Sequence, residues 1–114
     1  MAGEFNPNTT RTNPDTLAKY IRAPVEDSLQ SVPGIGPATD TALSAVGIQT
    51  TYQLFGLFLS LRGDGVSSVE LCERFYQWLK NKAELRVSRG EITQAVAEKL
   101  NMMFPGCYNP DAYA

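Results

Sequence analysis

The stretch LQSVPGIGPATDTALSAVGI (residues 29–48) decides the fold of this chain. Its centre, Pro33-Gly34-Ile35-Gly36, is a glycine-rich tight turn. Pro37 follows at the first helical position, where a missing N–H costs nothing, so a helix is predicted over Pro37–Val46. Gly47 then provides the left-handed residue that commonly ends a helix. Two helices joined by such a turn form a helix-hairpin-helix motif, which predicts an all-α domain.

The same turn is a candidate phosphate-binding site. Glycine lets the backbone approach a ligand with no side chain in the way. The N–H groups of Gly34, Gly36 and Ala38 would lack partners at the start of the next helix, and with the helix dipole they suit one phosphate oxygen. Ile35 would point into the core and anchor the turn. Such contacts read no base, so binding would be independent of sequence. The alternative interpretation is a plain connection between two helices.

The other segments also have helical patterns. Helices are expected over 15–22, after the cap Asn13 and Pro14, and over 25–32. The run TYQLFGLFLSL (residues 51–61), capped by Thr50 or Thr51, is apolar on nearly all sides. It is therefore expected to be a central helix or one half of a subunit interface.

Two capping boxes, Ser67–Glu70 and Ser88–Glu91, mark the starts of two more helices. The buried stripe of the first is expected to be Leu71, Phe75, Trp78 and Leu79, and that of the second Ile92, Val96, Leu100 and Met103. Residues 1–14 are expected to be a flexible leader and residues 107–114 a short tail, with Cys72 packed in a helix and Cys107 free in that tail. Residues 15–106 then form one compact five-helix domain.

Composition argues against catalysis. The chain has no histidine, which removes the commonest general base and zinc ligand, and its two cysteines are not spaced as a metal pair. We therefore expect no catalytic residue, no metal and no cofactor. The net charge of −2 argues against bulk electrostatic binding of DNA, although residues 80–89 are locally basic. No apolar run reaches the roughly 18 residues of a membrane span, so no membrane insertion is expected.

Two stretches, 29–61 and 75–104, which includes the single Trp78, resemble the barrier-to-autointegration factor family of small chromatin proteins. The resemblance implies a five-helix fold and a homodimer formed through the leucine-rich central helix. Each subunit would present one hairpin to a duplex, so that the dimer bridges two segments of double-stranded DNA. It also implies a groove that binds nuclear-envelope or chromatin proteins, and a location in the nucleus and cytoplasm.

Carried onto this chain, the resemblance together with the local charge pattern assigns DNA binding to Gly34, Ile35, Gly36, Pro37, Ala38, Arg86, Val87, Ser88 and Arg89. It assigns the dimer interface to Leu54, Phe55, Phe58 and Leu59. The chain departs from the family at Thr41, Ala42 and Ser88, where the family has lysines. Each lost phosphate contact weakens the salt-dependent part of binding.

Two alternatives remain open. The first is a protein-interaction paralogue that keeps the dimeric fold, has lost DNA binding and acts as a regulatory heterodimer partner. The second is a hairpin-containing DNA-repair enzyme, for which Asp40 and Asp64 are the only acids near the hairpin and the central helix. A gel shift at low salt separates the DNA-binding reading from the first alternative, and glycosylase assays test the second.

Overall fold

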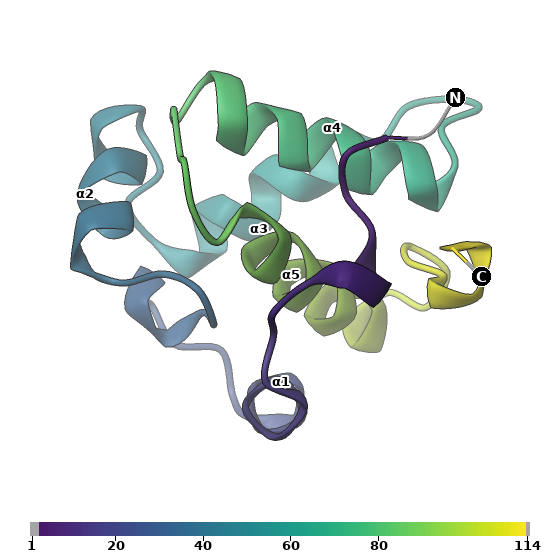
Figure 1. The fold of residues 1–114 in the computed structure, drawn as a ribbon, viewed down its shortest axis with the longest axis horizontal. Coiled ribbons are helices and arrows are strands. Elements are labelled where there is room, and N and C mark those ends of the chain that lie inside the picture. The colour runs from purple at the N-terminus through teal and green to yellow at the C-terminus, as the bar shows by residue number, and fades with distance from the viewer. Residues whose placement is uncertain (1–2, 114) are drawn as a thin grey trace.

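The computed structural model describes residues 3–113, which form five α-helices and no strand (Figure 1). This confirms the predicted all-α class. The α-helices are α1 (Pro14–Arg22), α2 (Pro37–Ala45), α3 (Thr51–Ser60), α4 (Ser68–Asn81) and α5 (Arg89–Met103). Three short 3-10 helices accompany them: η1 (Pro7–Thr9), η2 (Leu29–Ser31) and η3 (Pro110–Tyr113).

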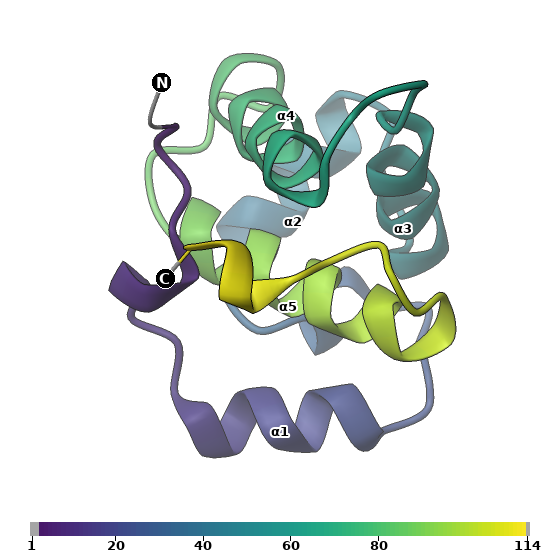
Figure 2. The same cartoon turned by 90° about the vertical axis from the view of Figure 1, so that its right-hand side faces the viewer.

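The central helix is α5, which packs against α1, α3 and α4. Figure 2 shows α1 running along one side of α5, with α4 on the opposite side. Residues on nearly every side of α5 are buried: Ile92, Thr93, Ala95, Val96, Ala97, Lys99 and Leu100. The expected stripe is confirmed except for Met103, which is exposed in the last turn beside exposed Met102 and Phe104. In α4 the stripe of Leu71, Phe75 and Leu79 is buried, and Trp78 is partly buried against the core.

Most predicted helix ends are confirmed because they depend on local hydrogen bonds. The Asn13 side chain accepts the N–H groups of Asp15 and Thr16, Thr50 forms a capping box with Gln53, and Ser67 caps α4. Gly47, with φ of +92°, follows the end of α2 in the left-handed conformation. The predicted capping box at Ser88 is wrong: this residue is left-handed (φ 62°) and its side chain caps nothing.

The predicted helix over 25–32 is also wrong, since only the turn η2 forms there. The backbone carbonyl of Asp27 accepts the N–H of Thr51 at 2.9 Å, and the carbonyl of Ser28 accepts its hydroxyl at 2.9 Å. The carbonyls of Asp27 and Ser28, which would accept N–H groups within a helix over 25–32, instead accept hydrogen bonds from Thr51 of α3. As a result, a single 3-10 turn precedes the hairpin, and the complete helix-hairpin-helix motif is not observed.

A buried lysine joins α1 to the central helix. Lys99 of α5 is 4% exposed, and its ammonium donates to the carbonyls of Tyr20 at 2.8 Å, Ile21 at 3.1 Å and Ala23. These carbonyls lie at the C-terminal end of α1, where helix carbonyls lack partners and the dipole favours a cation. The ammonium also lies 5.0 Å from the centroid of the Tyr20 ring. Lys99 thus provides a partner for the carbonyls of Ile21 and Ala23, and adds a second one for the carbonyl of Tyr20, which also accepts the N–H of Ala23 at 3.2 Å.

Both terminal segments are packed on the domain, contrary to expectation. Phe5 is 5% exposed, and η1 of the leader lies against η3 of the tail. Cys107 and Tyr108 are buried too, so the Cys107 thiol is unpaired as predicted but does not lie in a loose tail, and Cys72 is buried in α4 as predicted. Removing the aromatic side chains of Phe5, Tyr108 and Tyr113 from water stabilises the packing of both ends on the domain. Residues 1, 2 and 114 lie outside the described part of the chain.

Candidate nucleic-acid interface

The hairpin turn is anchored as its apolar residues predict. Ile35 is 5% exposed, and Leu29 and Val32 on the preceding turn are fully buried. The N–H of Ile35 donates to the carbonyl of Val32 at 3.0 Å, which tightens the turn. Pro37 and Ala38, at the start of α2, are exposed. The turn therefore holds a buried anchor and leaves the first turn of α2 at the surface.

Gly34 is the point at which the hairpin turn comes close to the start of α5. Its φ of +95° is a conformation that residues with side chains rarely adopt. A Cβ at this position would lie 3.1 Å from Cγ1 of Ile92, 3.2 Å from Cβ of Glu91 and 3.4 Å from Cβ of Ser88. The fold therefore requires glycine here. The same contact brings together the two segments, 34–38 and 86–89, that were assigned to DNA.

Gly36, in contrast, is not required by the fold. Its φ is −99°, and a Cβ there would meet no atom within 4 Å. It is the N-cap of α2 and provides no side-chain hydrogen bond to the helix. Within residues 3–113 the N–H groups of Gly34, Gly36 and Ala38 donate no hydrogen bond. The start of α2 thus has backbone donors without a partner among residues 3–113, and Gly36 among them has space for a side chain.

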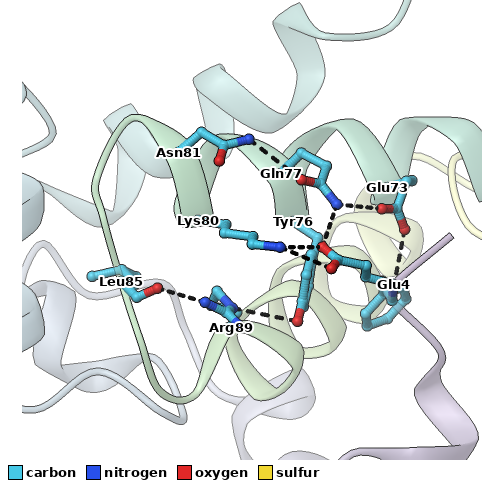
Figure 3. A network of polar contacts seen from close by, with 9 residues as sticks. Glu4, Glu73, Tyr76, Gln77, Lys80, Asn81, Leu85 and Arg89 are labelled. Atoms are coloured by element: carbon cyan, nitrogen blue, oxygen red, sulfur yellow. Dashed lines mark hydrogen bonds and ion pairs between the residues drawn. The ribbon is translucent and has the colours of Figure 1, made fainter.

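The start of α5 is a second helix N-terminus without a side-chain cap, since the Ser88 hydroxyl makes no capping bond. Arg86 and Val87 before it are exposed, and no partner of the Arg86 side chain is found among residues 3–113. Arg89 differs, because it is held against the protein (Figure 3). Its Nη1 donates to the carbonyl of Leu85 at 2.8 Å, and its guanidinium lies 5.3 Å from the centroid of the Tyr76 ring. Of the two arginines, only Arg86 is free to reach a ligand.

A cleft of about 400 Å³ opens beside the start of α5. It is lined by residues 86–91, by Tyr76 and by leader residues that include Glu4 and Arg11. The cleft therefore has a mixed charge, with three arginines and two glutamates. Arg11 belongs to the leader, which the sequence predicts to be flexible. Only its packing against the domain, where the N–H of Arg11 donates to Glu91 at 3.2 Å, brings it here.

The acids considered for catalysis have ordinary structural surroundings. Asp40 lies in the first turn of α2, where its carboxylate accepts hydrogen bonds from Gln30 at 3.0 Å and Ser44 at 3.4 Å. Asp64 is exposed in the turn between α3 and α4. Neither acid lines the cleft at the start of α5.

The predicted dimer interface is wrong for three of its four residues. Leu54 and Phe58 have no exposed surface and Phe55 is 6% exposed, all within a single copy of the chain. The Phe58 ring packs edge-on against Phe75 of α4, with centroids 5.2 Å apart. Only Leu59 is partly exposed. Leu54, Phe55 and Phe58 therefore belong to the core between α3, α4 and α5.

No protein-family model, curated protein or solved structure matches this chain. Within residues 3–113, none of the helices combines the length and the apolar character that crossing a bilayer requires.

Proposed function

We propose that this protein binds the phosphate backbone of double-stranded DNA, without sequence preference and without catalysis, through the hairpin turn and the start of α5. The observation that carries the proposal is the close approach of Gly34, three residues before α2, to Ser88 and Glu91 at the start of α5, where neither helix has a side-chain cap. Free N–H donors and the positive ends of two helix dipoles then lie on one surface, and phosphate oxygens match both. The open space at Gly36 leaves room for a duplex to approach the backbone.

The charges of this surface predict weak binding with a shallow dependence on salt. Arg86 and Arg11 line the cleft as exposed cations whose side chains have no partner among residues 3–113, whereas Glu4 and Glu91 line the same cleft. The slope of affinity against salt follows the number of phosphates that cations neutralise. Most of the interaction would then come from backbone donors, which release few counterions.

Bridging of two duplexes would need a second copy of the chain, and the copies would have to meet outside the buried face of α3. Met102, Met103 and Phe104 provide one such surface at the end of α5, where each is at least 45% exposed. The same apolar residues favour the second candidate function, a protein-interaction domain that has lost DNA binding. Its partners, following the family resemblance, would be chromatin or nuclear-envelope proteins.

A gel shift on a random-sequence duplex, at low and at moderate salt, tests the proposal. We expect Gly36→Glu to abolish the shift, because a carboxylate would occupy the phosphate position. The matched control is Gly56→Glu on the exposed side of α3, where a Cβ also meets no atom within 4 Å and the change in charge is the same. Circular dichroism checks that both variants keep their helices.

No shift of the unaltered protein at low salt would overturn the DNA proposal and leave the protein-interaction candidate. Equal binding by the Gly36→Glu and Gly56→Glu proteins would exclude the hairpin as the contact. The mass of the protein in solution, measured with and without the duplex, reports whether binding involves one copy or two.

A further inference from the structure

The leader runs beside α4, the start of α5 and the tail (Figure 2), and its residues 4–6 line two clefts between these elements, together called the groove. Its apolar anchor is Phe5, whose ring meets Tyr113 edge-on at 5.7 Å and lies 6.4 Å from Tyr76. The backbone N–H of Phe5 donates to a carboxylate oxygen of Glu73 at 2.9 Å. A buried aromatic side chain and a paired backbone group are the two elements by which grooves hold extended peptides.

The residue before the anchor is recognised through its charge. The carboxylate of Glu4 accepts two hydrogen bonds from the Lys80 ammonium, at 2.8 and 3.0 Å, and one from Gln77 at 2.6 Å (Figure 3). The hydrogen bonds from Lys80 and Gln77 hold the pKa of Glu4 below its usual value. The groove therefore binds an acidic residue through Lys80 and Gln77, and the aromatic residue directly after it through Tyr76 and Tyr113.

The leader does not fill the groove. The cleft of about 400 Å³ lies on the side of the α5 start, and a second cleft of about 550 Å³ lies on the side of the α4 start. Residues 4–6 line both clefts, so they form the wall between them. Without the leader, the two clefts would join into one channel along α4.

We propose that this channel is a docking site for an extended peptide of a partner protein that carries an acidic residue directly before an aromatic residue. The leader is the intramolecular occupant of the site and competes with that peptide. A tethered segment has an effective concentration on the order of millimolar. A partner must therefore displace the leader, and any change that weakens the leader opens the site. This proposal does not depend on DNA binding.

Fluorescence anisotropy with a labelled peptide of residues 3–11 (GEFNPNTTR), added to the full-length protein, tests the proposal. We expect the peptide to bind the Phe5→Ala protein roughly tenfold more tightly than the unaltered protein, which is the factor for a peptide of about 100 μM affinity facing a millimolar tethered competitor. Glu4→Lys provides a second way to loosen the leader, because Glu4 is exposed and the new charge repels Lys80. Trp78 fluorescence and circular dichroism report whether each variant is folded.

The specificity of the site has matched controls. In the Phe5→Ala background, Lys80→Glu should abolish peptide binding, whereas Lys82→Glu, an exposed lysine just beyond the end of the same helix, should not. A peptide with both Glu4→Lys and Phe5→Ala should not bind.

Peptide binding by the loosened variants no tighter than by the unaltered protein would overturn the proposal, as would binding that ignores Lys80. A dimer of the unaltered protein that Phe5→Ala dissociates would also overturn it, because the occupant would then be the leader of a second copy. A negative gel shift would leave these results unaffected, so failure of the DNA proposal and failure of this one are distinguishable.

Discussion

Replacement of Phe58 by alanine distinguishes a core position from a subunit interface. The family resemblance assigns Phe58 to a dimer interface, whereas the structure places it inside one copy of the chain with no exposed surface. Truncation therefore leaves a cavity in the core between α3 and α4. We expect a folded but much less stable protein.

The magnitude follows from the burial of the side chain. Full removal of a buried phenylalanine side chain costs about 3–5 kcal/mol, as the sum of lost burial and the cavity left behind. That range includes the edge-on contact of Phe58 with Phe75 at 5.2 Å. An aromatic pair of this kind contributes about 0.5–1.5 kcal/mol beyond the burial of its surface. At about 4 °C for each kcal/mol, the melting temperature should fall by about 12–20 °C.

Urea unfolding followed by circular dichroism measures this change, with Leu59→Ala as the control on the same helix. Leu59 is only partly buried, so its truncation should cost about 1–2 kcal/mol. Each experiment is run at two widely different protein concentrations, because the stability of an obligate dimer depends on concentration. A cost for Phe58→Ala below that of Leu59→Ala would refute the core assignment, as would a concentration-dependent midpoint of the unaltered protein that Phe58→Ala makes independent of concentration.

Three further predictions concern the buried lysine, the buried thiol and the two arginines. Lys99→Met should lower the free energy of unfolding in urea by about 2 kcal/mol, since it leaves the carbonyls of Ile21 and Ala23 unpaired, whereas exposed Lys82→Met should change it little. Equal effects would contradict the capping role. Burial raises the pKa of Cys72 to about 12, so the unfolded chain loses this proton first. The contribution of Cys72 to stability should fall from about pH 8.5 upward by at most ~1.4 kcal/mol per pH unit, and Cys72→Ala should remove this part of the fall and leave the part due to Cys107, whose pKa burial also raises. In gel shifts, Arg86→Ala should reduce the slope of log affinity against log salt concentration by about one, while Arg89→Ala should mainly lower the free energy of unfolding. A larger change of slope for Arg89→Ala than for Arg86→Ala would show that Arg89 leaves Tyr76 to contact DNA.

The helix starts and the glycine stop of α2 could be predicted because each depends on groups a few residues apart. Asn13, Thr50 and Ser67 cap helices through N–H groups two or three residues ahead of them. The part of the candidate site that was predictable is local in the same way: a turn with free donors at Gly36. Its proximity to residues 86–89 depended on the family resemblance, and the contact at Gly34 provides the physical reason.

The sequence by itself determined the all-α class, four of the helix starts and the buried stripes, because periodicity and capping are local properties of the chain. Only the tertiary structure decided that α5 rather than α3 is central, that residues 25–28 stay unwound and that the leader packs on α4. These outcomes depend on contacts between distant residues, such as Thr51 with Asp27 and Phe5 with Tyr113. The apolar residues of α3 suit a core and a subunit interface equally well, so only the positions of α4 and α5 could assign them.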